Sequence, residues 1–292
     1  MWQGRTHTLF LVLILSLFLG LWTESAHAEF QNSQCGQSNS KSQRYNWCIY
    51  SSGQKAPSQD VIYYFHGIRR DERAWGELNF HAPIITEWQK QRGYAPYVIS
   101  VSYGGEWTLT DTSLHGNRYT EFVNTVMKEM EQRLPAPPLK RYLIGESMGG
   151  YNASLLWLKN PELFEKVSIG CPAIAQIGPF SSSKEVNAYI SRTGANAFYV
   201  QMVLDVGKNE FANEKEYSEF NSLLLAQNLK PPVKTPIYIS CGDRDDFGFF
   251  EGAQLLYQAA TKAGAVSEFA PVKNGGHCRT DIGKLAQFFL SP

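Results

Sequence analysis

One serine in the sequence has the surroundings of a catalytic nucleophile. Ser147 lies in the pentapeptide Gly-Glu-Ser-Met-Gly, between Gly145 and Gly149. The run Tyr142 to Ile144 before it is typical of a buried strand, and Tyr151 to Lys159 after it has apolar residues at helical spacing. A serine on such a strand-to-helix turn exposes its hydroxyl group, and the glycines let chain segments pass closely because they have no Cβ. The pattern predicts an acyl-transfer nucleophile, with a purely structural turn as the alternative.

A nucleophilic serine requires a base that takes its proton and a carboxylate that orients the base. In the strand-turn-helix arrangement the three residues follow in the order Ser, Asp or Glu, His. Five of the six histidines precede Ser147: His7, His27, His66, His81 and His115. Only His277 follows it, in a glycine-rich loop between an apolar stretch and a terminal helical pattern. The order predicts His277 as the base, with a surface histidine in a flexible turn as the alternative.

Three aspartates are candidates for the carboxylate. The run Thr235 to Cys241, rich in β-branched and aromatic residues, predicts a buried strand, and it opens into a loop that holds Asp243, Asp245 and Asp246. One of them must point towards the histidine, while the others are solvated or cap the helix expected near Phe249. The loop by itself leaves all three open.

The developing oxyanion needs hydrogen-bond donors. One is the backbone N–H of the residue after the nucleophile, Met148. The second is expected in the loop after the predicted strand Val61 to Phe65, where the chain continues as His-Gly-Ile. We assign it to the N–H of Ile68, or failing that to Gly67. His66 is expected to tie this loop by hydrogen bonds and not to act as the base.

Aromatic and basic residues after other strand ends are candidates for substrate contacts. Trp75 and Tyr103 follow predicted strands and are assigned to substrate binding together with Gly67, with core packing as the alternative. Arg69 and Arg70 lie beside the expected oxyanion donor and would favour an acidic substrate, although arginines in such places are more often solvated.

The cysteines suit an oxidising compartment, in which disulfides persist. Cys35 and Cys48 flank a polar segment and are predicted to pair. Cys171 and Cys241 end two strands that we expect to be neighbours, and Cys278 directly follows the predicted base. A bridge from Cys241 to Cys278 would hold the base loop against the aspartate loop, which is our hypothesis for these three. The odd total of five leaves at least one thiol free or paired elsewhere.

Charge and cysteine spacing exclude other classes of function. The formal net charge is zero, so nothing indicates binding to nucleic acid or to an anionic membrane. Zinc spacing such as Cys-x-x-Cys does not occur in the sequence, so no metal is predicted. The expected chemistry requires no cofactor.

The N-terminus has the pattern of an export signal. Arg5 precedes the apolar run Leu9 to Trp22, and Ala-His-Ala at residues 26–28 offers small residues for cleavage. The run is shorter than the roughly 20 residues of an ordinary membrane span. We predict a signal peptide over residues 1–28, a mature chain that begins at Glu29, and a secreted or periplasmic protein without stable membrane insertion. A retained anchor is the alternative.

Residues 29–292 are long enough for a single α/β domain with a substantial core. Strands alternate with helices after an antiparallel pair near Arg44 to Ser51, which predicts a mostly parallel, twisted sheet with helices on both faces. The expected strands are Val61–Phe65, Tyr97–Ser102, Arg141–Gly145, Lys166–Gly170, Pro236–Cys241 and Val266–Ala270. The expected helices are near Thr120–Arg133, Met148–Lys159, Phe249–Ala263 and Asp281–Leu290. Every candidate group then lies at the carboxyl end of a strand, where open α/β sheets bind ligands.

The elbow and its partners resemble the α/β-hydrolase superfamily, and within it the esterase D-like group. The resemblance is densest over Gly145–Tyr151 and Lys159–Val167, where members carry a similar Ser-Met-Gly-Gly helix followed by Lys-Asn-Pro and the next strand. It extends to the His66-Gly67 pair. The resemblance implies the α/β-hydrolase fold for this chain.

The resemblance also bears on the aspartate loop. The group's pattern of a glycine, two residues, the catalytic Asp, one residue and Phe maps onto Gly242, Asp245 and Phe247. It therefore implies Asp245 as the carboxylate, ahead of Asp246 and then Asp243.

Two departures from the group matter for function. Glu146 stands where many relatives have His, which leaves the mechanism unaffected in principle. Residues 179–230 match nothing in the group. Insertions between these strands usually form a cap over the pocket in this superfamily, so the resemblance implies a cap insertion at about 175–232.

The site residues and the resemblance together imply an exported serine esterase. Ser147 would attack the carbonyl carbon of a carboxylic ester after His277 takes its proton, and water would release the acyl-enzyme. The substrate is expected to be a small-molecule or glycan-linked ester. An acyltransferase to a carbohydrate or lipid alcohol is the alternative, and a non-catalytic binding domain is a further one.

Overall fold

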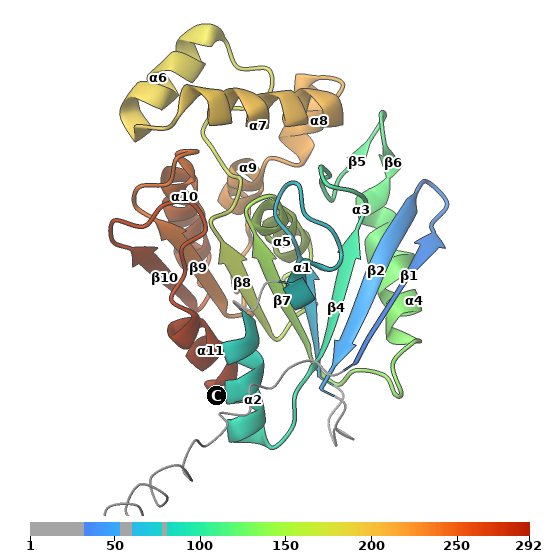
Figure 1. Ribbon diagram of the computed structural model, residues 1–292. Coiled ribbons are helices and arrows are strands. Elements are labelled where there is room, and N and C mark those ends of the chain that lie inside the picture. The colour runs from blue at the N-terminus through green and yellow to red at the C-terminus, as the bar shows by residue number, and fades with distance from the viewer. Residues whose placement is uncertain (1–31, 53–59, 78–80) are drawn as a thin grey trace, which may run out of the picture.

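Eight strands form the central sheet of the computed structural model, which describes residues 32–52, 60–77 and 81–292. Their spatial order is β1-β2-β4-β3-β7-β8-β9-β10 (Figure 1). The bounds are β1 Asn32–Asn39, β2 Arg44–Ser51, β3 Val61–Phe65, β4 Tyr97–Ser102, β7 Arg141–Glu146, β8 Lys166–Gly170, β9 Ile237–Gly242 and β10 Ser267–Val272. All neighbours from β4 to β10 are parallel, whereas β1 and β2 are antiparallel at one edge. The predicted mostly parallel sheet is confirmed.

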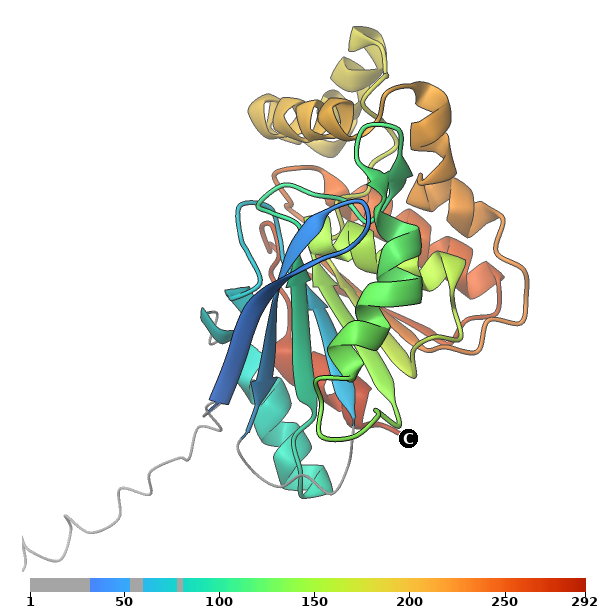
Figure 2. The same ribbon diagram turned by 90° about the vertical axis from the view of Figure 1, so that its right-hand side faces the viewer.

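Helices cover both faces of this sheet (Figures 1 and 2). On one face lie α2 (Ala82–Arg92) and α11 (Ile282–Leu290), which pack against each other. On the other face lie α5 (Met148–Lys159), α10 (Phe249–Lys262), and a helical run made of α3 (Arg118–Glu121), the π-helical turn η2 (Phe122–Val126) and α4 (Met127–Glu131). The short α1 (Ala74–Glu77) follows β3, and β5 (Asp111–Thr112) pairs with β6 (Gly116–Asn117).

The predicted strands and helices agree with these bounds to within two residues at each end. The helix predicted near Thr120–Arg133 is present, although its middle turn is π-helical. Helix α2 was not predicted, because Ala82–Arg92 has only three buried residues among polar ones and no strong apolar stripe.

The central strands are apolar throughout because both of their faces are buried. Successive side chains of a strand point to opposite faces of the sheet. On β3, Val61, Tyr63 and Phe65 pack in the core beneath α5 and α10, while Ile62 and Tyr64 pack in the core beneath α2 and α11. Such continuous apolar runs are typical of parallel strands covered on both sides.

The segment between β8 and β9 holds four further helices, and we call residues 171–236 the cap segment. These helices are α6 Ser183–Thr193, α7 Ala197–Glu210, α8 Glu214–Glu219 and α9 Ser222–Gln227. Each begins after a polar residue whose side chain accepts a backbone N–H, namely Ser182, Asn196, Asn213 and Asn221. Figure 1 shows α6 and α7 above the carboxyl ends of the parallel strands, while α9 contacts α5 and α10. The residues predicted to form a cap, about 175–232, fall within this segment, and their role as a cap stays a prediction.

A buried ion pair joins the end of α7 to the first residue of α3. Glu210 Oε1 accepts a hydrogen bond from Arg118 Nη1 at 2.9 Å and another from Thr110 Oγ1 at 2.7 Å. Both charged side chains are almost fully buried. Removal of one partner of such a pair typically costs about 3–5 kcal/mol, because the other charge is left uncompensated. The pair therefore holds α7 above the sheet.

Among the helices within the described ranges, none is long and apolar enough to cross a membrane. The predicted signal peptide, residues 1–28, and the predicted mature start at Glu29 lie outside the described residues. Both stay predictions.

Candidate active site

Ser147 lies on the tight turn between β7 and α5. Its backbone has φ 56° and ψ −117°, in the positive-φ region that non-glycine residues seldom adopt. Neighbouring strands and the helix hold this conformation: the Ser147 N–H donates to Gly170 O at 3.0 Å, and the Ser147 carbonyl accepts from the N–H groups of Tyr151 and Ala173. The turn that the sequence predicts at Ser147 is therefore present with a strained backbone, and the role of Ser147 as nucleophile stays a prediction.

The two glycines of the elbow are required by close packing. A Cβ on Gly145 would overlap the carbonyl oxygen of Gly149. A Cβ on Gly149 would overlap the carbonyl oxygens of Phe65 and His66. Because these obstacles are backbone atoms of the sheet and the helix, they cannot move aside cheaply. The clash predicted for larger residues is confirmed.

The structure brings Ser147, His277 and Asp245 together above the sheet. His277 Nδ1 lies 2.7 Å from Asp245 Oδ2, and His277 Nε2 lies 2.9 Å from Ser147 Oγ. The carboxylate only accepts, so Nδ1–H donates to it, and Nε2 then accepts from the serine hydroxyl group. The three residues follow β7, β9 and β10, whose carboxyl ends meet at this edge. The result is a continuous hydrogen-bonded relay from hydroxyl group to carboxylate.

The backbone of its own loop fixes the Asp245 carboxylate. Oδ1 accepts from the N–H of Phe247 at 2.9 Å and more weakly from that of Phe249 at 3.4 Å, which leaves Oδ2 for His277. The side chain is fully buried, whereas Asp243 and Asp246 are exposed. Of the three candidate aspartates, only Asp245 contacts the imidazole among the described residues.

The expected oxyanion donors flank the nucleophile. Met148 is the first residue of α5, so its N–H has no acceptor within the helix. Ile68 shares the wall of one pocket with Ser147 and Met148. Gly67 lies just before it, where an added Cβ would stand 3.5 Å from the Cβ of Ser147. The roles of Met148 and Ile68 stay predictions.

His66 is a loop tie, as predicted. Its ring is fully buried, with Nδ1 2.8 Å from the Gly67 carbonyl oxygen and Nε2 2.8 Å from Ser102 Oγ. Trp107 Nε1–H donates to Nε2 at 3.2 Å. Burial is the main reason that the pKa of His66 falls below its ordinary value of 6.5. A neutral imidazole therefore holds the loop that carries Ile68.

The lowered pKa of His66 predicts a loss of stability in mild acid. Below pH 6.5 the unfolded chain takes up a proton that the native protein refuses, so the free energy of unfolding falls as the pH drops towards the folded pKa. One such proton changes it by at most about 1.4 kcal/mol per pH unit. Denaturant unfolding of wild type and His66→Gln measures this effect. The destabilisation by the variant should be smaller at about pH 5 than at about pH 7.5, and a constant difference would contradict the prediction.

The family model described as "Putative esterase" matches residues 38–280 of this chain. The match covers most of the sequence, including the elbow, the aspartate loop and the histidine loop. The chain belongs to this esterase family. No curated protein sequence matches it.

Solved structures of esterases share the fold of this esterase family member at low sequence identity. A ferulic acid esterase is 16% identical with a TM-score of 0.64, and the alignment covers 89% of this chain and 95% of that one. An S-formylglutathione hydrolase from Agrobacterium tumefaciens is 15% identical with a TM-score of 0.61, covering 88% and 91%. A bacterial brefeldin A esterase is 12% identical with a TM-score of 0.63, covering 90% and 75%. These likenesses show the α/β-hydrolase fold.

Trp75 and Tyr103 of the esterase lie outside the pocket beside Ser147. Trp75 is buried in the core beneath α2 and stacks on His81, with ring centroids 4.3 Å apart. Tyr103 packs between Tyr45 and Trp107, at 5.8 and 5.2 Å. Neither belongs to the pocket wall, so the structure gives their predicted substrate contacts no support.

Arg69 and Arg70, which lie beside the expected oxyanion donor, are exposed to solvent. This agrees with the alternative that arginines in such places are solvated. The backbone N–H of Arg69 donates to Gly105 O at 2.7 Å, which anchors the loop. Its guanidinium group lies 3.6 Å from the sulfur of Met202 on α7. Arg69 therefore touches the cap segment at the edge of the site.

The disulfides of the esterase differ from our hypothesis in one pair. Cys35 and Cys48 are bridged between facing positions of β1 and β2, as predicted. Cys278 is bridged to Cys171 and not to Cys241, so the Cys241–Cys278 hypothesis is wrong. Cys241 lies inside β9 and points into the core near Asp245, whereas Cys171 lies just past the end of β8, level with the histidine loop.

The corrected pairing predicts the chemistry of the thiols. Burial is the main reason that the pKa of the Cys241 thiol lies well above its usual range, so Cys241 should resist alkylation until the protein is unfolded.

The double variant Cys171→Ser/Cys278→Ser should lower the free energy of unfolding by about 2–4 kcal/mol. It should also lower esterase activity, because Cys278 adjoins the predicted base.

The matched control is Cys35→Ser/Cys48→Ser, which removes the edge-strand disulfide and should leave activity unchanged. Peptide mass mapping of the unreduced protein checks the pairing itself. A peptide that links Cys241 to Cys278 would contradict the structure.

One group of possible metal ligands occurs in the described part of the chain: Cys171, His277 and Cys278. Both sulfurs belong to the disulfide, and both ring nitrogens of His277 have hydrogen-bond partners. The three atoms are therefore committed to other bonds, and the absence of a metal stays a prediction.

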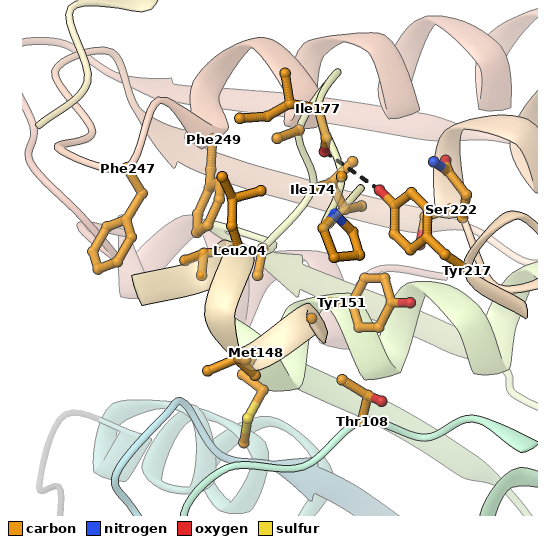
Figure 3. Close-up of a pocket in the computed structure, with 18 of the residues that line it drawn as sticks. Thr108, Met148, Tyr151, Ile174, Ile177, Leu204, Tyr217, Ser222, Phe247 and Phe249 are labelled. Carbon is orange, nitrogen blue, oxygen red and sulfur yellow. Dashed lines mark hydrogen bonds between the residues drawn. The ribbon is translucent and has the colours of Figure 1, made fainter. Parts of the chain in front are cut away.

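An apolar pocket lies between the sheet edge and the cap segment (Figure 3). Phe247 and Phe249 line one side of it, and Tyr217 and Ser222 line the other. The remaining wall residues are Ile68, Thr108, Ser147, Met148, Tyr151, Ala173, Ile174, Ala175, Ile177, Gly178, Pro179, Met202, Val203, Leu204, Val206, Gly207, Phe211 and Asn221. Most of these residues were not predicted from the sequence. Tyr151 could have been found from its position one helical turn after Ser147, whereas the residues of the cap segment have no local signal.

Proposed function

We propose that this protein is a serine esterase that hydrolyses carboxylic esters through an acyl-enzyme. The observation that carries the proposal is the relay in which His277 contacts Ser147 Oγ at 2.9 Å and Asp245 Oδ2 at 2.7 Å. Membership of the esterase family supports the reaction class.

Each residue of the relay has one task. As Ser147 Oγ attacks the ester carbonyl carbon, His277 Nε2 takes its proton, and the Asp245 carboxylate stabilises the imidazolium. The N–H groups of Met148 and Ile68 stabilise the oxyanion. The imidazolium then gives the proton to the leaving alcohol. Water, deprotonated by His277 in turn, attacks the acyl-enzyme and releases the acid.

The acceptor of the acyl group distinguishes hydrolysis from the alternative. A carbohydrate or lipid alcohol in place of water would give an acyltransferase with the same residues. Product analysis with and without a sugar alcohol separates the two, because only transfer yields a new ester. We take hydrolysis as the reaction, since ester hydrolases recur among the structural neighbours.

We also propose that the protein is exported after removal of residues 1–28. The pattern of that segment favours export, and two disulfides suit an oxidising compartment.

A fluorophosphonate probe tests the proposed function directly, because it reacts with serines that an adjacent base activates. Peptide mass spectrometry of the labelled protein should find the adduct on Ser147, together with hydrolysis of p-nitrophenyl acetate by the unlabelled protein. A folded protein that neither takes up the probe nor hydrolyses the ester would be a non-catalytic domain.

A further inference from the structure

The pocket extends from Ser147 along helix α5. The nucleophile and Met148 begin α5, and Tyr151 lies one turn further along the same helix. Beyond Tyr151 the wall continues to Ser222, whose hydroxyl group contacts Ser154 of α5 at 2.8 Å. The cavity therefore follows α5 away from the nucleophile, and Figure 3 shows Leu204 of α7 on the opposite side from Ser222.

Most polar side-chain groups of the wall already have hydrogen-bond partners within the protein. Tyr151 Oη donates to the Phe220 carbonyl oxygen at 2.8 Å, and Tyr217 Oη donates to the Ile177 carbonyl oxygen at 3.3 Å. The Asn221 side-chain oxygen accepts two backbone N–H groups of α9. Thr108 and Ser222 bond to other hydroxyl groups.

Within the described residues, the pocket wall contains no charged side chain. A sugar or a charged group in this pocket would give up its hydrogen bonds to water and find few partners, which is costly. An apolar group meets no such penalty and gains from removal of its surface from water. The wall therefore selects for hydrocarbon.

The position of the base decides which part of the ester enters. The leaving alcohol must stay within reach of His277 Nε2, which protonates it. His277 packs against Phe247 on one side of the pocket, with ring centroids 4.4 Å apart, whereas Tyr217 and Ser222 line the other side. The group that remains bonded to Ser147 in the acyl-enzyme is thus the one that lies along the pocket.

We propose that the preferred substrates are esters of aliphatic acids longer than acetate, with the acyl chain held between α5 and α7. The inference rests on the proposed serine esterase function and adds its acyl specificity. The alcohol contributes little to selectivity, because it departs on the side of His277.

A series of p-nitrophenyl esters tests the acyl preference. Each methylene group added from acetate to hexanoate should raise kcat/KM about threefold, so hexanoate should exceed acetate by about 80-fold. A second series of alkyl acetates, in which only the alcohol grows, should show a nearly flat kcat/KM. A flat or falling acyl series in an active enzyme would overturn the inference and leave the esterase function standing.

A charge placed in the pocket tests its location. Val203 is a half-buried pocket residue of α7, whereas Phe198 on the same helix is 70% exposed and lies outside the wall. Val203→Asp should lower the ratio of hexanoate to acetate kcat/KM at least about tenfold, while Phe198→Asp should keep the wild-type ratio. Equal ratios in both variants would contradict the proposed site.

Two further measurements separate failure of the acyl specificity from misfolding of the variant and from failure of the proposed esterase function. If Val203→Asp does not fold, Val203→Thr replaces it, because threonine exchanges a methyl group for a hydroxyl group at nearly constant volume. The ratio of hexanoate to acetate kcat/KM should then also fall. If no ester is hydrolysed and Ser147 takes up no fluorophosphonate, the proposed function fails and the acyl specificity fails with it.

Discussion

Ser147→Ala is expected to lower kcat/KM for p-nitrophenyl acetate by a factor of at least about 10,000. Alanine has no nucleophile, so no acyl-enzyme forms, and His277 has no hydroxyl proton to take. Pocket binding and the oxyanion donors remain, which leaves only a small residual rate over that in water. Because the hydroxyl group bonds to no described side chain other than His277, the melting temperature should change little.

The matched control is Ser183→Ala, which removes an exposed hydroxyl group at the start of α6, away from the relay. It should keep wild-type activity. The measurement is steady-state hydrolysis together with fluorophosphonate labelling, which Ser147→Ala should abolish. Retention of more than about one hundredth of the activity in a pure, unlabelled variant would remove Ser147 from the mechanism.

Asp245→Asn is expected to lower kcat at neutral pH by about 1,000- to 10,000-fold. The amide oxygen can still accept from Phe247, so the loop should keep its shape. With its oxygen held by Phe247, the amide turns its NH2 group towards Nδ1 and donates a hydrogen bond to it. The amide also carries no charge that could stabilise an imidazolium. His277 then tends to carry its proton on Nε2, where it cannot accept the proton of Ser147.

The neighbouring aspartates of the same loop provide the controls. Asp243 and Asp246 are exposed and do not contact His277. Asp243→Asn and Asp246→Asn each remove the same charge and should stay within about twofold of wild type. If Asp246→Asn abolished turnover while Asp245→Asn did not, the carboxylate would have been assigned to the wrong residue.

The order of residues along the chain was enough to predict Ser147 and His277 as partners, and the structure places His277 Nε2 2.9 Å from Ser147 Oγ. Ser147 lies in a Gly-x-Ser-x-Gly pattern with a strand pattern before it and a helical pattern after it, and His277 is the sole histidine that follows. Both signals are local or depend on order alone, so they need no knowledge of packing. The alternation of apolar runs with helical spacing likewise indicates the parallel sheet.

The aspartate and the cysteines show where such reasoning ends. Asp243, Asp245 and Asp246 are chemically identical in the loop, and the resemblance, not the loop, favoured the buried one. The strands that end in Cys171 and Cys241 were correctly expected to be neighbours. Adjacent strands do not fix which sulfur reaches a third loop, and the bridge forms with Cys171.

The residue pattern alone indicated the parallel core strands, four of the helices around them and the turn that holds Ser147, because these follow from backbone preferences over short stretches. It did not indicate the helices of residues 82–92 and 183–227. Tertiary packing settles which carboxylate meets the imidazole, which cysteine is bridged to the histidine loop, and which side chains of the cap segment enclose the pocket. Each of these outcomes depends on side chains from distant segments that meet within a few ångströms. A shift of one residue in the position of a segment would turn different side chains towards the site, and the local sequence pattern does not fix positions to within one residue.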